Sequence, residues 1–378
     1  MQVTDVEAIP LVHELPEGRT LGSSRGQTGE RFTTLVRLET DDGTVGWGEA
    51  FAPARTVATL VEEVFADRVL GLDPHDAASF VEESYTTGYH FGRASFVRCA
   101  VSGIDVALHD ILGKATGQPI HKLLGGGAVD SLTPYASTGY VSSWDWSVAE
   151  QVGTAAEEGF TAAKIKIGTG IEEDVQRVRD AREALGEDAT LMVDYNGNYR
   201  PKQALQSVEA IEPYDVAWIE EPVPAENLSG YRELSQQVDV PLAAGEAHFS
   251  RFEFRDLVED RTVDVVQPNL GRCGGFTEAK LIGQMATTEN VAVRPHVWNS
   301  GVGVAAAVQF AATVPDYPHN TNVVDPLLFE FDRSENPLRH EILDDPFDPT
   351  GGDLPVPDDP GLGIEIDEEA VERYRVDT

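Results

Sequence analysis

The chain of 378 residues exceeds the usual size of one domain, and its length fits a barrel of about 250 residues together with a smaller domain. Asp and Glu number 65 against 28 Lys and Arg, which gives a formal charge of -37 at pH 7. Such a charge repels phosphate backbones and anionic lipids, so it excludes nucleic acid and membrane surfaces as partners.

The acidic excess is spread along the whole chain and is not confined to a tail. Repulsion among so many like charges destabilises a compact state unless salt screens it, and at molar salt the Debye length falls to about 3 Å. We interpret the composition as adaptation to a high-salt cytoplasm and not as a sign of a ligand.

Cysteine content and the chain start favour a cytoplasmic, soluble protein. Cys99 and Cys273 lie far apart, so no disulfide framework and no Cys-x-x-Cys site is predicted. The first residues lack the basic start and apolar run of a signal peptide. The longest stretch of small apolar residues, 301–314, contains Gln309 and is too short to span a bilayer.

Residues 1–125 predict an α+β domain. The segment 31–50 is typical of two strands around the turn Asp41-Asp42-Gly43, and helical patterning follows it to about residue 124. The clearest helix is 97–114. Three glycines at 125–127 cannot usefully extend a helix or strand, so they mark a boundary.

Residues 126–345 alternate short apolar, β-branched runs with segments of helical patterning, such as 172–185 and 202–211. The runs are 133–138, 162–167, 190–193, 216–219, 240–243, 263–266 and 291–293. This alternation indicates parallel strands with right-handed crossovers. Seven or eight such units favour an α/β fold of the (β/α)7β TIM-like barrel type, with an open sheet as the alternative.

Polar residues stand at the ends of successive runs. They are Lys164 and Lys166, then Asp194, Glu220, Glu246, Asn269 and His296. From Lys166 the intervals are 28, 26, 26, 23 and 27 residues, which is one β/α unit each time. In a barrel these side chains converge on the face where barrel active sites are built.

Asp194, Glu220 and Glu246 would repel one another strongly at a distance of a few Å, so a divalent cation is expected between them. Ligation by oxygen alone favours Mg²⁺ over softer metals. The alternative is that each is a solvated loop acid, which is the better interpretation of any one of them in so acidic a chain. Three carboxylates in phase favour the metal site.

Lys164 and Lys166 alternate on one strand, so both ammonium groups point into the barrel mouth. Neighbouring positive charge, including Mg²⁺, lowers a lysine pKa and allows the neutral amine to act as a base. His296 follows a later run across the barrel and could serve as an acid or base on the opposite face. The alternatives are a pair of surface lysines and a structural histidine.

Two other signals compete with this site. The segment 301–306 superficially matches a dinucleotide fingerprint, but it follows a late strand and lacks the acidic residue that holds a ribose, so we predict the start of a helix. His13, His90 and His248 could reach the site from loops. An exposed or core position is favoured for His90, and both interpretations stay open for His13 and His248.

At these residues the chain resembles the mandelate racemase and muconate lactonizing branch of the enolase superfamily, nearly from end to end. Among the acid-sugar enzymes of this branch it is most similar to galactarolactone cycloisomerase and acid-sugar dehydratases. The segments that carry the resemblance are 42–49, 53–55, 102–108 with 113–114, 164–168, 218–222, 245–246, 273–276, 295–298, 329–333 and 360–364.

The resemblance implies that Asp194, Glu220 and Glu246 bind Mg²⁺, that Lys166 is the base beside Lys164, and that His296 faces them. It implies that domain 1–125 caps barrel 126–345, with loops 19–29 and 51–55 closing over a small-molecule carboxylate, and that segment 346–378 returns to the cap. The residues expected to bind the substrate are Arg25, His13, Asn196, Asn269, Trp298 and Glu330. We also expect a homo-oligomer.

Asn269 departs from the pattern of the branch, in which many members pair the histidine with an aspartate. An amide can orient the imidazole but carries no charge to stabilise an imidazolium, so His296 should be a poorer base. This argues against a racemase or epimerase, which needs a base on both faces. It favours β-elimination as a dehydratase or lactone cycloisomerase, in which Lys166 takes the proton and an oxygen leaves, with His296 as a candidate proton donor.

Overall fold

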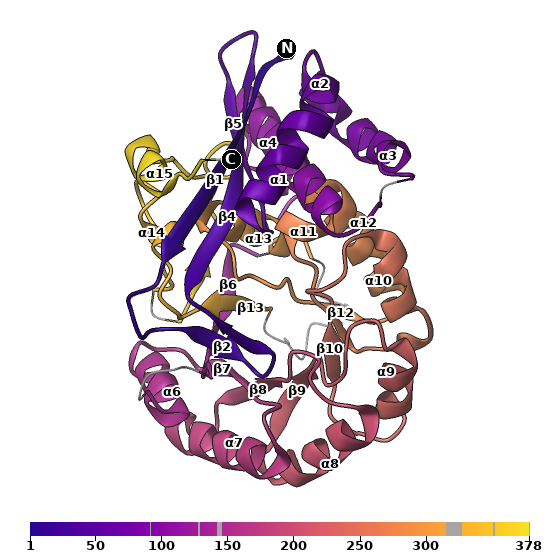
Figure 1. The fold of residues 1–378 in the computed structure, drawn as a ribbon, viewed down its shortest axis with the longest axis vertical. Helices are drawn as coiled ribbons and strands as arrows, with labels where there is room; N and C mark the ends of the chain where they lie inside the picture. The colour runs from indigo at the N-terminus through magenta and orange to yellow at the C-terminus, as the bar shows by residue number, and fades with distance from the viewer. Residues whose placement is uncertain (91, 128, 142–145, 315–326, 351, 378) are drawn as a thin grey trace.

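A three-stranded antiparallel sheet begins the chain in the computed structural model, which describes residues 1–378 apart from 91, 128, 142–145, 315–326, 351 and 378 (Figure 1). Its strands are β1 (Val3–Glu14), β4 (Glu30–Thr40) and β5 (Val45–Ala50), in the order β1–β4–β5. β4 and β5 pair around a turn in which the Gly43 N–H donates to the Thr40 carbonyl at 2.9 Å. The strands expected on either side of this turn are confirmed.

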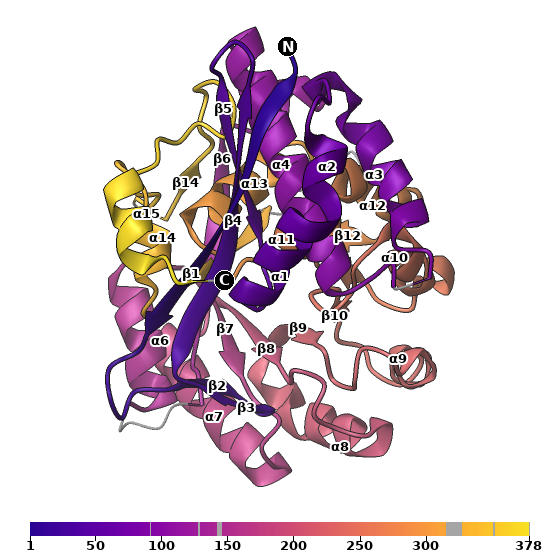
Figure 2. The same cartoon turned by 45° about the horizontal axis from the view of Figure 1, so that its top comes forward.

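A short hairpin leaves the sheet between β1 and β4 and reaches the barrel (Figure 2). It consists of β2 (Leu21–Ser23) and β3 (Gly26–Thr28). The Gly22 carbonyl accepts a hydrogen bond from the Val141 N–H at 2.9 Å, and the Ser24 hydroxyl donates to the Tyr195 carbonyl at 2.6 Å. The hairpin is therefore tied to the barrel by backbone carbonyls on both sides.

Helices cover the sheet. They are α1 (Ala54–Leu60), the π-helix η1 (Val61–Phe65), α2 (Ala66–Val69), the 3-10 helix η2 (Pro74–Asp76), α3 (Ala77–Thr87), α4 (Phe96–Thr116) and α5 (Ile120–Leu123). The helix expected at 97–114 is α4. A Cβ atom on Gly48 of β5 would lie 2.0 Å from the Gly103 carbonyl oxygen of α4. Glycine at position 48 thus lets helix and sheet backbones touch.

Parallel strands then curl into the expected barrel (Figure 1). The strands are β6 (Ser131–Thr138), β7 (Ala162–Lys166), β8 (Thr190–Asp194), β9 (Val216–Glu220), β10 (Leu242–Ala244), β11 (Val265–Val266), β12 (Ala292–Val293) and β13 (Leu328–Asp332). They pair in the order β12–β11–β10–β9–β8–β7–β6–β13. Near the ends of this ladder the Val297 N–H, just after β12, donates to Glu330 of β13 at 2.8 Å.

The crossovers are helical, which confirms the (β/α)7β pattern. They are α6 (Val148–Glu157), α7 (Ile171–Leu185), α8 (Pro201–Ile211) with η3 (Glu212–Tyr214), α9 (Leu228–Ser235), α10 (Arg251–Val258) with η4 (Glu259–Arg261), α11 (Leu270–Cys273) with α12 (Gly275–Thr288), and α13 (Gly301–Ala311). The segment 301–306, which superficially matches a dinucleotide fingerprint, is the buried start of α13, as expected. In the described part of the chain, no helix combines the length and apolar character needed to cross a membrane.

The last segment runs back to the first strand. It contains α14 (Pro337–His340), β14 (Leu354–Pro355), which pairs with β6, and α15 (Glu368–Tyr374). The Val376 N–H donates to the Pro10 carbonyl of β1 at 3.0 Å. Figure 1 shows α15 beside β1, so the end of the chain lies against its beginning.

Candidate active site

The predicted polar residues meet at the C-terminal ends of the barrel strands, because strand period and barrel curvature turn them inward. On β7, Ala163 and Ile165 face outward into the hydrophobic core, whereas Lys164 and Lys166 face the barrel interior. Asp194 and Glu220 end β8 and β9, and Glu246 follows β10 by two residues. The intervals counted in the sequence thus correspond to adjacent strand ends.

One oxygen from each of Asp194, Glu220 and Glu246 lies within 4.8 Å of the others. Asp194 and Glu220 are fully buried, and Glu246 is partly exposed. These oxygens suit Mg²⁺, which prefers oxygen ligands and is held in proteins by carboxylates. The chemistry of the donor set therefore fits the expected ion.

The two lysines pair with these acids. Lys166 Nζ lies 2.5 Å from Asp194 Oδ2, and Lys164 Nζ lies 2.6 Å from Glu220 Oε1. Lys164 also contacts Glu330 Oε1 at 2.8 Å, so it is enclosed between two carboxylates. Lys164 is fully buried, whereas Lys166 lines the cavity.

Burial and the neighbouring acids oppose each other at both lysines. Burial is the largest single influence on Lys166 and would lower its pKa, but Asp194 together with Glu246 and Tyr140 outweighs burial, and the pKa is raised. The pKa of Lys164 is likewise raised, because Glu220 and Glu330 outweigh burial. With protein groups alone these pKa values are therefore high, and the lowered values expected from the sequence depend on positive charge held by the same carboxylates.

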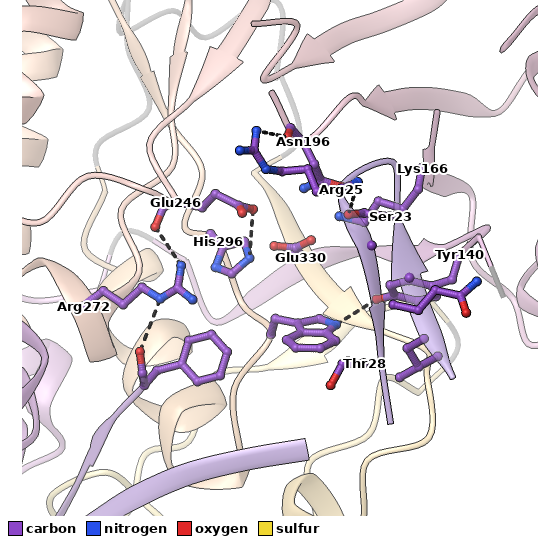
Figure 3. A pocket seen from close by; sticks show the side chains of 16 residues that line it. Ser23, Arg25, Thr28, Tyr140, Lys166, Asn196, Glu246, Arg272, His296 and Glu330 are labelled. Atoms are coloured by element: carbon purple, nitrogen blue, oxygen red, sulfur yellow. Dashed lines mark hydrogen bonds and ion pairs between the residues drawn. The ribbon is translucent and has the colours of Figure 1, made fainter. Parts of the chain in front are cut away.

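His296 is held between an amide and a carboxylate, and Figure 3 shows the carboxylate, Glu246. Its Nε2 lies 3.1 Å from Glu246 Oε2, and its Nδ1 lies 2.9 Å from the Asn269 amide nitrogen. Burial is the main reason that the pKa of His296 is lowered. Asn269 is completely buried and does not line the cavity. It contacts and orients the histidine ring, although we expected it to bind the substrate.

A cavity of about 390 Å³ opens above these residues. Of the residues expected at the substrate, Arg25, Asn196, Trp298 and Glu330 line it together with Lys166, Glu246 and His296 (Figure 3). The hairpin β2–β3 and Phe51 also line the cavity. They belong to the loops 19–29 and 51–55, which we expected to close over the substrate. His13 does not line the cavity, because β1 carries it to the edge of Tyr374, with ring centroids 5.8 Å apart.

Three further residues of the site were not predicted. Tyr140 lines the cavity 26 residues before Lys166, so the same strand-end interval would have found it. Gln267 directly follows β11 and donates to Glu220 Oε2 at 2.6 Å. Arg272 lies on α11, where no strand period applies, and its guanidinium donates to the Glu246 carbonyl at 3.0 Å.

A buried polar network fixes Trp298 at the cavity wall. Its indole N–H donates to the Tyr140 hydroxyl at 3.0 Å, which in turn donates to Asp332 at 2.7 Å. Arg31 lies 3.6 Å above the indole ring and pairs with Asp332 at 2.7 Å. Because Arg31 belongs to β4, this network also joins the N-terminal sheet to the barrel.

Comparison with known proteins agrees with this arrangement. Residues 8–125 match the mandelate racemase / muconate lactonizing enzyme N-terminal domain, and residues 147–370 match the enolase C-terminal domain-like family. D-galactarolactone cycloisomerase of Agrobacterium fabrum is 37% identical over 100% of this chain and 99% of its own length. D-galactonate dehydratase of Variovorax paradoxus is 32% identical, with 89% of each chain covered.

The fold is also similar to a solved structure that carries the same kind of name. The 3,6-anhydro-D-galactonate cycloisomerase of Zobellia galactanivorans has a TM-score of 0.89 and 32% identity, with all of both chains covered. These relatives are cycloisomerases and a dehydratase, and the chain is an enzyme of the lyase or isomerase type. Its two matched domains place it in the mandelate racemase and muconate lactonizing enzyme family of the enolase superfamily.

Proposed function

We propose that this enzyme uses Mg²⁺ to remove the proton next to the carboxylate of an acid sugar or of its lactone, and then expels the β-oxygen. The observation that carries the proposal is the meeting of Asp194, Glu220 and Glu246 with Lys164 and Lys166 at one barrel mouth. Bound there, Mg²⁺ would supply positive charge against the negative charge that develops on the substrate carboxylate.

Lys166 is the better candidate for the base. Its ammonium group lines the cavity, whereas Lys164 is enclosed between Glu220 and Glu330 and does not line the cavity. Lys166 accepts a proton only as the neutral amine. Positive charge held by Asp194 would cancel the interaction that raises the pKa of Lys166, and this would bring the neutral amine within reach.

The cavity wall supports a polyhydroxylated acid as substrate. Arg25 donates to the Asn196 and Gly197 carbonyls at 3.2 and 3.1 Å, and Arg272 donates to the Glu246 and Phe51 carbonyls. Neither guanidinium is paired with a carboxylate among the described residues, so both keep charge and donors for a ligand. The cycloisomerase and the dehydratase named above act on galactarolactone and galactonate, which are a lactone of a polyhydroxylated acid and such an acid itself.

The proposal is tested by incubating aldonates, aldarates and their lactones with the enzyme and Mg²⁺ in D₂O and following the proton NMR spectrum. We expect one compound to give a 2-keto-3-deoxy acid. Deuterium in unconsumed substrate of inverted configuration would instead identify a racemase or epimerase, and full activity in EDTA would overturn the metal assignment.

A further inference from the structure

Arg98 is a completely buried arginine with one edge of its guanidinium unpartnered. It stands in the first turn of α4 and is 0% exposed. Its Nη1 donates to the Ser84 hydroxyl at 3.1 Å, but in the part of the chain that the structure describes its Nε and Nη2 have no hydrogen-bond partner. Nε and Nη2 share one edge of the planar guanidinium, the edge through which arginine binds anions with two parallel hydrogen bonds. This edge is therefore a pair of donors without an acceptor.

Arg98 lies where the N-terminal helices meet the barrel. A Cβ atom on Gly274, between α11 and α12, would be 3.1 Å from Arg98 Cδ, so the stem of the arginine packs directly on the barrel backbone. The Arg98 guanidinium carbon lies 3.9 Å from the ring centroid of Tyr85, which belongs to α3. Helices α3, α4 and α12 contact one another, and Figure 1 shows α12 beside α3. A ligand of Arg98 would thus be enclosed by both parts of the fold.

The charge of Arg98 is not neutralised by an ion pair with any acid among the described residues. Glu278 is the buried carboxylate of this junction, but it accepts from the Arg251 guanidinium at 2.8 Å, from the Arg251 N–H at 2.9 Å and from the Tyr85 hydroxyl at 2.8 Å. Burial, the largest influence, lowers the pKa of Arg98, and Glu278 does not offset it. By contrast, the hydrogen bond to Glu82 raises the pKa of Arg251. A buried charge without a partner is costly, so Arg98 is expected to bind an anion.

The start of α4 adds positive potential at this position. The helix has 21 residues, and the side chain of its N-cap residue, Ser95, makes no capping hydrogen bond. Peptide dipoles concentrate partial positive charge on the first turn of a helix, where Arg98 stands. A cavity of about 470 Å³, lined by Tyr85, Arg93 and the acidic Glu253 among others, ends at the ring that is stacked on Arg98. Ions from the solvent therefore come within one side chain of Arg98.

We propose that Arg98 binds a chloride ion through Nε and Nη2, and that this ion stabilises the contact of α3 and α4 with the barrel. The number of donors favours a halide over an oxyanion. A sulfate or phosphate held by two N–H groups in a closed site would leave most of its oxygens without donors, whereas a single chloride ion satisfies both N–H groups. A water molecule could also accept from both, but it would leave the buried positive charge uncompensated.

The first experiment measures the Tm of the protein in potassium chloride and in potassium isethionate at the same concentration. Isethionate is a bulky sulfonate that the closed site excludes. A ligand that binds only the folded state raises its stability, so the wild type should gain at least about 2 °C more from chloride than Arg98→Met gains. Methionine keeps much of the side-chain volume without the charge. Equal gains in the two proteins would overturn the proposal.

Arg93→Met is the matched control. Arg93 is exposed, and its guanidinium carbon lies 5.3 Å from the ring centroid of Tyr89, so the variant makes the same change of charge near the same junction. It should keep the full chloride effect. A loss in Arg93→Met as large as in Arg98→Met would show that chloride acts on the surface charge as a whole, which would overturn a site at Arg98.

A second experiment locates the ion and needs only the wild type, so it decides the question even if Arg98→Met does not fold. Crystals are grown in potassium bromide, and anomalous diffraction is recorded at the bromine absorption edge. We expect a peak within hydrogen-bonding distance of Nε and Nη2 of Arg98. A water molecule in that place would overturn the proposal, as would a peak without any chloride effect on the Tm, which is binding at crystal concentration only. Neither experiment uses turnover, so both are independent of the proposed elimination.

Discussion

Glu220 uses both of its oxygens inside the protein, because one accepts from Lys164 and the other from Gln267. Glu220→Gln preserves the side-chain shape but removes the charge that a cation needs. We expect weaker Mg²⁺ binding by calorimetry and loss of turnover, with an unchanged circular dichroism spectrum. The control is Glu226→Gln, an exposed acid that follows the same strand, which should behave like the wild type.

Lys166 and His296 lie on opposite sides of the cavity (Figure 3), so their variants should separate two steps of the reaction. Lys166→Ala should remove essentially all exchange of the α-proton with D₂O. His296→Asn should retain exchange but slow product formation, by about 10²- to 10⁴-fold if its hydrogen bond is as effective as general acid assistance. The opposite result, with exchange lost only in the histidine variant, would reverse the assignment of the base.

Asp332 links stability to pH. Burial acts against its ionisation, but Arg31 and Arg339 outweigh burial and hold its pKa well below the ordinary range. A depressed pKa stabilises the fold above the unfolded value of about 4 and loses this contribution as the pH falls through the folded pKa. Arg31→Met should therefore lower the free energy of unfolding at pH 7 by about 3 to 5 kcal/mol.

This loss should shrink as the pH falls below about 4, because protonation of Asp332 removes the charge that the variant leaves poorly paired. Urea denaturation at several pH values measures the difference. Arg37→Met is the matched control, since Arg37 pairs with the exposed Glu39 at 2.8 Å and Asp5 at 3.6 Å on the protein surface, where such pairs contribute about 0 to 1 kcal/mol. A constant difference between Arg31→Met and the wild type would contradict the assignment.

At the level of elements, strand period explains what could be predicted. Lys164 and Lys166 lie on one strand, and the polar residues at the following strand ends recur at intervals of one β/α unit. Sequence spacing alone was therefore enough to predict that these side chains lie close together. β13 was not among the predicted runs, because Glu330 and Asp332 alternate with Phe329 and Phe331 and interrupt the apolar run. Tertiary contacts placed His13, and no local pattern could show that β1 carries it to Tyr374.

The hairpin β2–β3 brings Arg25 to the cavity, where its guanidinium donates to the Asn196 and Gly197 carbonyls. Arg25→Gln should raise KM by about tenfold, equivalent to the loss of one hydrogen bond to a charged group, while kcat changes little. Steady-state kinetics on the identified substrate measures both constants. Arg37→Gln, on β4 at the surface, is the control with the same charge change, and a loss confined to kcat would contradict a binding role for Arg25.

Over the whole molecule, the charge of -37 is the dominant long-range electrostatic feature. If repulsion opposes folding, salt should stabilise the protein, because screening shortens the range of that repulsion. We expect a higher Tm in about 2 M KCl than in about 0.1 M KCl, where the Debye length is about 10 Å. Comparison with the non-ionic osmolyte sucrose separates screening from general exclusion, and equal effects would argue against adaptation to high salt.

The position of the hairpin has a consequence for how this enzyme could diverge. The groups assigned to the reaction stand on barrel strands and the turns after them, whereas Ser23, Arg25, Gln27 and Thr28 reach the same cavity from a short segment near the start of the chain. Mutation of these few codons can therefore change which molecule is accepted while the reactive groups stay as they are. Related enzymes that share the barrel chemistry can in this way come to accept new substrates through a few substitutions in the hairpin.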